Sequence, residues 1–407
     1  MRGGRPSAST AHRASPETDV EKGNGVAESV SAAIAGVGAS RQGKLPGETD
    51  LSLATEALRA ALDDSGFTKG DIDGLLTMPG TTTADPAKHY LRLGEHLGIN
   101  PKIAGSVSAG GATAGMLVQQ AALAVHAGMA EVVAVVFGDA ARTGGSRFSA
   151  PSGAAVSSSN WGMYGNAANS ALGARRHMAL YGTTSEQLGW VAVNGRRNAS
   201  LNPDAVMREP ITLADHQSSR MIVDPLHLLD CCLISDGGVA LIVTSRERAR
   251  DARSGAADIL GMGQGHTLQT LERKDWWYLP HQQDCVSRAY RMAGLSPADI
   301  DVAQLYDNFT ISVLFWLEHG GFVKPGESGP FVEGGKRIAL DGELPINTAG
   351  GNLSESYMQG WLHVVEGVRQ VRGEGGPRQV PGARTCLVTG RGMTLQTASC
   401  LILGAAS

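Results

Sequence analysis

The chain has little of several features that mark particular protein classes. Aromatic residues make up only 5% of its 407 residues, and charged residues make up 18%. The net charge is −4, so the chain lacks the strongly basic surface by which proteins bind nucleic acid. Its longest apolar runs, such as Val132–Phe137, are far shorter than the roughly 20 residues that span a bilayer. We therefore expect neither nucleic acid nor a membrane as a partner.

Cysteine is also sparse, and its spacing carries no signal. None of the cysteines forms a C-x-x-C motif, so the sequence predicts neither a zinc site nor a redox pair. Their odd number fits a reducing cytosol. The five are Cys231, Cys232, Cys285, Cys386 and Cys400.

The N-terminus has no apolar segment of the kind found in secretory signals. Residues 1–25 are polar, and we expect them to form a disordered tail. The last residues, 404–407, match no peroxisomal address and no lipidation motif. These features predict a cytoplasmic protein.

What the chain does contain is a pattern that occurs twice, about half its length apart. The phrase G-F-T-K-G-D-I-D at 66–73 mirrors G-L-S-P-A-D-I-D at 294–301. A strand pattern and then a helical pattern precede each phrase. They are Ala32–Gly38 and Leu53–Ser65 in the first copy, and Ala257–Gly263 and Val286–Ala293 in the second. We interpret the glycine cluster at 261–265 as a turn at the end of a strand.

The second part of each copy begins with Ala-Gly-Gly. Residues 109–111 precede a long Ala-rich helix predicted at Ala112–Gly128, and residues 349–351 precede one at Leu353–Arg372. A β-branched strand follows each helix, at Glu131–Phe137 and at Arg384–Thr389, and we expect both strands to end at glycine turns. Strand and helix patterns that alternate in this way predict an α/β fold.

The repeat divides the chain into residues 26–255 and 256–407. Residues 142–224, rich in Ser, Asn, Arg and Gly, interrupt the first copy. We expect an inserted loop domain there, with helices at Asn166–Tyr181 and Ser185–Ala199, and insertions of this size are usually functional. The aromatic segment Asp275–His281 fits an interface, a lid, a substrate wall or core packing.

These features resemble the thiolase superfamily, and within it the sterol-carrier-protein-type thiolases and their lipid-transfer-type bacterial relatives. The resemblance covers roughly residues 30–404. It implies a duplicated five-layer αβαβα sandwich, usually a homodimer, with the active site between the halves. Besides the repeat, it is carried by the phrases at 198–203 (N-A-S-L-N-P), 224–226 (D-P-L), 235–238 (S-D-G-G) and 347–351 (N-T-A-G-G).

The residues on which thiolase chemistry depends are missing. Aligned with the family's motifs, the two catalytic cysteines fall on Gly111 and Val388. The family's asparagine falls on Tyr306, and its histidine on Tyr357. Claisen chemistry through a thioester needs a thiolate and a base, so we expect no thiolase activity.

The two tyrosines resemble a pattern in thiolase-like aldolases of bacterial steroid side-chain catabolism. That resemblance implies retro-aldol cleavage of a β-hydroxyacyl-CoA to a ketone or aldehyde and a shorter acyl-CoA, such as propionyl-CoA. We expect one of Tyr306 and Tyr357 to be the base and the other the proton donor or orienter, with no covalent acyl-enzyme. Backbone N–H groups near Gly111 and Gly392 are the candidate oxyanion donors.

Charged residues near these positions are further candidates. Asp307 and Glu355 flank the tyrosines, either as groups that tune them or as capping carboxylates. Coenzyme A enters as part of the substrate, and we expect no bound cofactor and no metal. Arginine forks suit its phosphates, although they also suit a solvated basic face. The candidates are Arg142, Arg147, Arg175, Arg176, Arg196 and Arg197, with His177 among them.

The resemblance also implies a partner, a small OB-fold protein with a zinc ribbon, supplied by another chain. Two other functions stay open. A degenerate thiolase would bind acyl-CoA or a partner without catalysis. An acyltransferase would use a relocated nucleophile, such as Cys285, Cys386 or a hydroxyl.

Overall fold

The computed structural model describes residues 30–146, 165–267, 280–392 and 396–406. The predicted tail at 1–25, Arg147 and most of the aromatic segment at 275–281 lie outside these ranges. None of the helices within them combines the length and the apolar character that a membrane crossing requires.

The first half contains the predicted strands and helices, together with a helix at 89–97 and a strand at 103–106 that the repeat did not predict. Its main elements are β1 (Ala32–Ala39), α1 (Asp50–Ser65), β2 (Gly74–Met78), α2 (His89–Leu97), β3 (Ile103–Ser106), α3 (Thr113–His126), β4 (Val132–Ala140), β7 (Asp236–Ser245) and α8 (Arg246–Ala249). Three 3-10 turns accompany them: η1 (Lys69–Asp71), η2 (Pro86–Lys88) and η3 (Gly110–Ala112).

The insertion and the second half follow. The insertion contains α5 (Gly165–Tyr181), α6 (Ser185–Ser200), α7 (Leu213–Ser218) and β5 (Met221–Val223). Between its end and β7 lie β6 (Leu226–His227) and η5 (Leu228–Asp230). The second half contains β8 (Ala257–His266), α9 (Pro280–Ala293), η6 (Pro297–Asp299), β9 (Val302–Gln304), α10 (Thr310–His319), α11 (Ser328–Val332), α12 (Gly351–Ser354), α13 (Trp361–Arg372), η7 (Gly376–Arg378), β10 (Thr385–Gly392) and β11 (Thr397–Ala405).

Among the described residues, nine strands form one hydrogen-bonded sheet in the order β3-β2-β4-β7-β1-β8-β11-β10-β9. The neighbours β1 and β8 join its two halves. Outward from β1 come β7 and β4, both paired antiparallel, and then β2, paired parallel. Outward from β8 come β11 and β10, both paired antiparallel, and then β9, paired parallel. The repeat seen in the sequence is therefore a repeat of topology.

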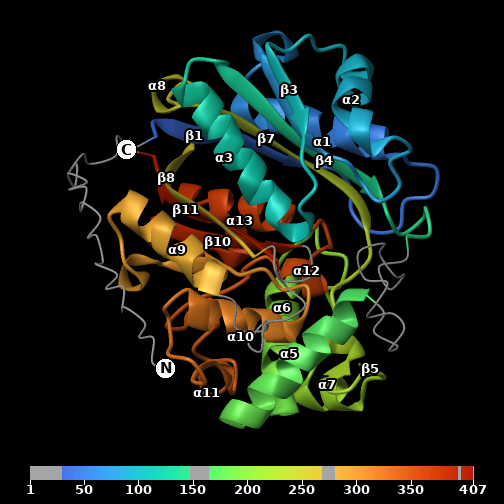
Figure 1. Ribbon diagram of the computed structural model, residues 1–407, viewed down its shortest axis with the longest axis vertical. Coiled ribbons are helices and arrows are strands. Elements are labelled where there is room, and N and C mark those ends of the chain that lie inside the picture. Colours follow the sequence, from blue (N-terminus) through green and yellow to red (C-terminus); the bar gives the residue numbers. More distant parts are fainter. Residues whose placement is uncertain (1–29, 147–164, 268–279, 393–395, 407) are drawn as a thin grey trace, which may run out of the picture.

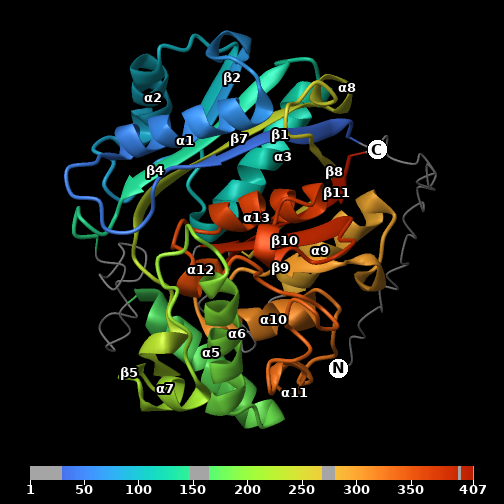
Figure 2. The same ribbon diagram turned by 180° about the vertical axis from the view of Figure 1, so that it is seen from behind.

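The two half-sheets lie on either side of the central helices α3 and α13 (Figures 1 and 2). Both central helices contact strands of both halves. Helices α1 and α2 cover the outer face of the first half-sheet, and α9 and α10 cover that of the second. This arrangement is the predicted five-layer αβαβα sandwich.

Strand β4 is apolar throughout because both of its faces are buried. Val132, Ala134 and Val136 pack under the outer helices, whereas the alternate residues face the central helices. Among the latter, the ring of Phe137 stacks on Trp361 of α13 at a centroid distance of 5.4 Å. A strand buried on both faces needs an unbroken apolar run rather than an alternating one.

The predicted turn at glycines 261–265 is wrong, because β8 continues through the cluster to His266. A Cβ on Gly263 would overlap the carbonyl oxygen of Cys285 on α9, and the other two glycines meet α9 in the same way. These glycines therefore allow a helix to lie close to the strand. Strands β4 and β10 likewise run on through the glycines at which they were expected to end.

The long helix predicted at Leu353–Arg372 is also wrong, because it is broken into α12 and α13. Gln359 and Gly360 have left-handed φ values of 49° and 84°, which no α-helix interior accepts. The break takes Tyr357 out of the helix. The other predicted helices agree with the structure to within a few residues at most ends, and α9 begins earlier than expected.

The insertion leaves the first half after β4 and returns to it at β7. Its helices nevertheless pack on the second half: α5 and α6 both contact α10, and α6 also contacts α11 and α12 (Figure 2). The insertion thus departs from the first half and packs on helices of the second.

The glycines of β8 give a test of this packing. We expect Gly263→Ala to lower the free energy of unfolding by about 2–3 kcal/mol, because α9 has to move away from the strand. The control is Gly105→Ala on β3, where a Cβ would lie 3.8 Å from Leu76 and make an ordinary contact. Urea unfolding of both variants measures the difference. An equally small effect at both sites would contradict the packing argument.

Candidate active site

Two buried tyrosines meet between the halves of the molecule. Tyr306 follows β9, and Tyr357 lies in the break between α12 and α13. Their hydroxyl oxygens are 3.3 Å apart, and the two residues are 2% and 9% exposed. The structure therefore brings together the two tyrosines that the sequence singled out, which stand 51 residues apart along the chain.

Gly111 lies against the ring of Tyr306. A Cβ at this glycine would overlap the ring and its hydroxyl, and a Cβ at Gly360 would come within 3.0 Å of the same ring. The sequence motifs predict that Gly111 stands at the position of the thiolase nucleophile. Here the phenol ring of Tyr306 fills the space that such a side chain would occupy.

The strand β10 contributes glycines to the same place. A Cβ on Gly390 would lie 2.6 Å from the carbonyl oxygen of Gly111, and one on Gly392 would overlap that of Ala109. Val388, to which the alignment assigned the second thiolase cysteine, packs in the central apolar layer. Because β10 runs on through the glycines, positions 388, 390 and 392 share this face, and the assignment to Val388 stays a prediction.

Backbone donors are available near the tyrosine pair. Gly111 belongs to η3, the turn that leads into α3. The first N–H groups of a helix have no acceptor within it and carry partial positive charge. The location suits a developing oxyanion, and the oxyanion roles of Gly111 and Gly392 remain predictions.

The two phenols differ in their electrostatic surroundings. Burial raises the pKa of both tyrosines above the ordinary value of 10. The hydrogen bond between them lowers the pKa of Tyr306 and raises that of Tyr357. The Arg391 guanidinium also lowers the pKa of Tyr306. Of the two, Tyr306 is therefore the phenol whose anion receives stabilising interactions.

Asp307 is turned toward α12 and α13. Its carboxylate accepts a hydrogen bond from the N–H of Asn352 at 2.8 Å and lies 3.0 Å from Nε2 of His363. The His363 ring in turn packs edge-to-face on Tyr306, with centroids 6.4 Å apart. The charge of Asp307 raises the pKa of Tyr306, so it opposes ionisation of that phenol.

Glu355, the second flanking carboxylate, contacts the end of α6. Its Oε1 accepts a hydrogen bond of 3.2 Å from Nδ2 of Asn202. Burial, and then the nearby charge of Glu366, raise the pKa of Glu355 to about 8, against the lowering effects of Arg369 and Arg378. Its predicted role in tuning the tyrosines is not tested by this geometry.

The segment that carries Tyr357 is held by the first half of the molecule. The N–H of Tyr357 donates to Oγ of Ser235 at 3.4 Å, and Oγ of Ser356 donates to Oε1 of Gln42 at 2.9 Å. Gln42 lies in the loop after β1 and also donates to the carbonyl oxygens of Ser40 and Gly238.

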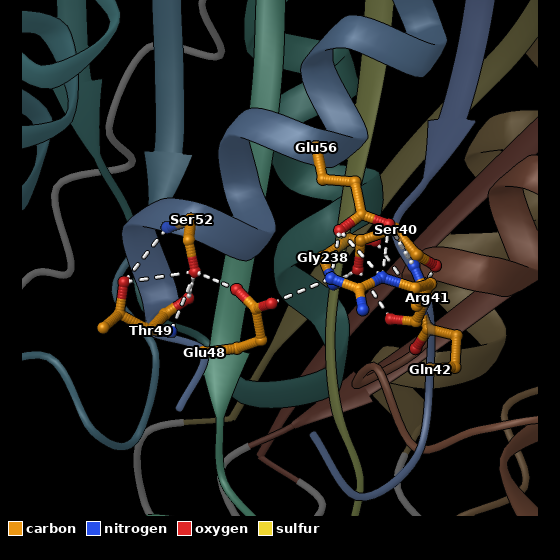
Figure 3. Close-up of polar contacts among 8 residues, drawn as sticks. All are labelled: Ser40, Arg41, Gln42, Glu48, Thr49, Ser52, Glu56 and Gly238. Carbon is orange, nitrogen blue, oxygen red and sulfur yellow. Dashed lines mark hydrogen bonds and ion pairs between the residues drawn. The ribbon is translucent and has the colours of Figure 1, made fainter. Parts of the chain in front are cut away.

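An ion-pair cluster fixes this loop to α1 (Figure 3). The neighbouring Arg41 pairs with Glu48 at 2.8 Å and with Glu56 at 3.2 Å. Its backbone N–H also donates to the Glu56 carboxylate. The position of a second-half tyrosine therefore depends on contacts made by a first-half loop.

Two residues that sequence reasoning missed lie near the tyrosine pair. Arg391, 3% exposed, stands between two glycines that the sequence did single out, and a charge inside an apolar strand was the available signal. Cys232 is partly buried, and a charge on its sulfur would raise the pKa of both tyrosines. Burial raises the pKa of Cys232 itself well above 9.

The cysteines proposed as relocated nucleophiles are poorly suited to that role. Cys285 and Cys386 are fully buried, and burial raises the pKa of both thiols. Cys285 lies on α9 and faces β8, and Cys386 lies in β10 under α13. A thiol without access or a base does not supply the thiolate that acyl transfer requires.

The arginines predicted to bind CoA do not form one group. Arg142, Arg175, Arg176 and Arg197 are exposed. Arg175 pairs with Asp224, and Nη1 of Arg142 donates to a backbone carbonyl.

Arg196 is buried, and its donors bind Oγ of Ser354 and the carbonyl oxygen of Glu209. Arg196 therefore joins α6 to its neighbours and is not free to bind a phosphate.

Comparisons with known proteins agree with this geometry. Residues 263–405 match the thiolase C-terminal domain-like family. The steroid side-chain-cleaving aldolase of Thermomonospora curvata is 41% identical, over 92% of this chain and 98% of that protein. The 17-hydroxy-3-oxo-4-pregnene-20-carboxyl-CoA lyase of Mycobacterium tuberculosis is 39% identical, over 88% and 95% of the two chains. A solved structure, the Ltp2-ChsH2(DUF35) aldolase, has a TM-score of 0.84 at 42% identity and covers 92% and 98% of the two chains.

The fold and the site define a thiolase-fold protein without the thiolase cysteines and histidine. The chain belongs to the thiolase superfamily, in its group of lipid-transfer-type thiolase-like aldolases.

Glu355 gives a pH-dependent test of the site. Its pKa is about 8 in the native protein and near 4.5 when exposed, so the native state binds more protons between these values. The stability that protonated Glu355 contributes is present below about pH 4.5 and is lost as the pH rises toward 8. We expect Glu355→Gln to flatten this decline and to be more stable than wild type at pH 8, by roughly 2–4 kcal/mol.

Urea unfolding between pH 5 and pH 8 measures this effect. The control is Glu95→Gln, an exposed carboxylate on α2. If Glu355→Gln and the control keep the same pH slope as wild type, the buried carboxylate does not behave as described.

Proposed function

We propose that this protein is a carbon–carbon lyase that cleaves a β-hydroxyacyl-CoA by a retro-aldol reaction. The products are a ketone or aldehyde and a shorter acyl-CoA such as propionyl-CoA. The observation that carries the proposal is the buried pair of tyrosine hydroxyls, 3.3 Å apart. The sequence motifs align these two tyrosines with catalytic residues of thiolases. The names of the aldolase and lyase relatives support a steroid side-chain CoA thioester as the substrate.

The reaction needs one base and one acid. The base removes the proton of the β-hydroxyl as that oxygen becomes a carbonyl. The bond between Cα and Cβ then breaks, and its electron pair moves onto Cα and the thioester oxygen as an enolate. The acid protonates Cα and so completes the shorter acyl-CoA.

We assign Tyr306 as the base and Tyr357 as the acid. In this assignment Tyr357 donates the hydrogen bond that joins the two hydroxyls. This bond and Arg391 lower the pKa of Tyr306, and the bond raises the pKa of Tyr357. After the reaction, Tyr306 carries the proton taken from the substrate, and Tyr357 has lost its own. The direct contact between the two oxygens lets the proton return and restores both residues.

Backbone donors complete the site. The N–H groups near Gly111 and Gly392 are proposed to hold the thioester oxygen as it gains charge, an interaction that typically stabilises a transition state by about 3–4 kcal/mol. No bond forms between the enzyme and the acyl group, so none of the proposed steps requires the missing thiolase cysteines. CoA acts only as the carrier of the substrate, and the exposed arginines of the insertion are proposed to meet its phosphates.

The partner belongs to this proposal as well. The solved relative is named as an assembly of Ltp2 with a DUF35 part of ChsH2. This supports a small partner of that class, which we expect to be an OB-fold protein with a zinc ribbon. We also propose that the chain works as a homodimer in the cytoplasm.

Tyrosine variants test the chemistry. The enzyme is co-expressed with its DUF35-type partner and given a 17-hydroxysteroid C20-carboxyl-CoA thioester, and the products are read by mass spectrometry. We expect Tyr306→Phe and Tyr357→Phe each to lower kcat by about 10²- to 10⁴-fold, because each removes one proton transfer. Tyr290→Phe, which loses a buried hydroxyl bonded to Gly320 outside the site, should keep wild-type activity.

Other outcomes separate the alternative functions. Cleavage that survives both tyrosine changes would leave the reaction class in place and remove our assignment of residues. An added acyl mass on the intact protein, lost in Cys232→Ser, would identify an acyltransferase, since this cysteine lies near the tyrosines. Binding of the thioester with neither cleavage nor adduct would identify a non-catalytic acyl-CoA binder.

A further inference from the structure

Arg391 is a buried cation on the strand β10. The glycines on either side of it face η3, as shown by the Cβ overlaps at Gly390 and Gly392. Because side chains alternate along a strand, Arg391 projects from the opposite face, toward α10. There one of its terminal nitrogens, Nη2, donates to Oγ of Ser312, and its guanidinium lies 5.6 Å from the ring centroid of Phe315.

The charge of Arg391 has no carboxylate to balance it within the described ranges. Its other terminal nitrogen, Nη1, is buried and has no hydrogen-bond partner there. Two other arginines with buried guanidinium groups are paired: Arg372 with Asp64 at 2.8 Å, and Arg378 with Glu366 at 3.0 Å. Arg391 therefore differs from them in holding a desolvated charge that hydroxyl and aromatic contacts only partly offset.

Such an arrangement is costly for the folded protein. An unpaired buried charge costs several kcal/mol, and the N-terminal end of α10, near Ser312, adds partial positive charge. Burial accordingly lowers the pKa of Arg391 to about 9. The cost is offset when an anion forms within reach of the guanidinium.

Tyr306 is the nearby group that forms an anion in the proposed reaction. Its backbone N–H donates to Oγ1 of Thr389 at 3.0 Å, two residues before Arg391 on the same strand. Around its phenol, the hydrogen bond shared with Tyr357 lowers the pKa of Tyr306, while Cys232 and Asp307 disfavour negative charge on it. Among the described residues, Arg391 is the arginine whose charge lowers the pKa of this phenol, and the charge of the phenol in turn favours the guanidinium. The ring of His363 also packs edge-to-face on Tyr306, and it is paired with Asp307.

We propose that Arg391 is a positioning residue whose buried charge stabilises the Tyr306 phenolate, so that Tyr306 can take the β-hydroxyl proton. This inference rests on the proposed lyase function. It deepens that function by assigning the tuning role, expected from the sequence for Asp307 and Glu355, to a cation on the opposite face of β10. Arg391 itself touches no reacting atom.

Two variants of Arg391 distinguish an effect of its charge on the reaction from an effect of its side chain on folding. Arg391→Met keeps much of the bulk and removes the charge, and we expect kcat to fall about 10- to 100-fold with KM changed less than threefold. The apparent pKa of the rising limb of the kcat–pH profile should move to higher pH. Arg391→Lys keeps a cation. We expect this variant to show the rising limb of the kcat–pH profile at the wild-type pH and to keep most of the wild-type kcat. Stability of both variants is measured by urea unfolding.

A double-mutant cycle tests the coupling directly. In the Tyr306→Phe background there is no phenolate to stabilise, so adding Arg391→Met should change the residual rate less than twofold. A purely structural role would give the same loss in both backgrounds and would overturn the inference. So would an unshifted pH profile in Arg391→Met.

The remaining outcomes are also decisive. If Arg391→Met does not fold, Arg391→Lys carries the test, and loss of the rising limb in that folded variant would overturn the inference. Cleavage by wild type with additive losses in the cycle would contradict only the role of Arg391. Absence of cleavage by wild type with its partner would instead refute the proposed function, and the inference with it.

Discussion

The structure depends on the burial of two helices, α3 and α13, between two half-sheets. Both helices contact strands of both halves, so their side chains fill a single apolar layer that holds the molecule together. Such close packing leaves no room for side chains where a helix backbone lies over a strand, as at the glycines of β8 under α9. The same requirement places glycines around the start of α3, and that is where the tyrosine pair lies.

At the start of α3, the packing of the chain also limits which catalytic side chains can be present. The ring of Tyr306 occupies the space beside Gly111, so a nucleophilic side chain at position 111 and a tyrosine at position 306 exclude each other. The loss of the thiolase cysteine and the gain of the phenol are therefore linked by geometry. Tyr357 reaches the same place because the chain leaves the helical path between α12 and α13, and a first-half loop holds it there through Gln42.

Electrostatics then distinguishes two phenols that are chemically alike. Both are buried, which keeps a lone tyrosine protonated. The hydrogen bond between them lowers the pKa of Tyr306 and raises that of Tyr357, and Arg391 also lowers the pKa of Tyr306. The proposed roles of base and acid follow from this difference, whereas the sequence presents two equal candidates.

The sequence by itself determined the features that depend on local pattern and on composition. The repeated strand and helix patterns, the helices of the insertion and the absence of the thiolase cysteines were readable because periodicity and residue identity are local properties. The tertiary structure decided the contact between two tyrosines 51 residues apart, the break before α13, the close approach of Gly390 to Gly111, and the unpaired charge of Arg391. These depend on which segments meet in space, and burial and the balance of charge at a site exist only once they have met.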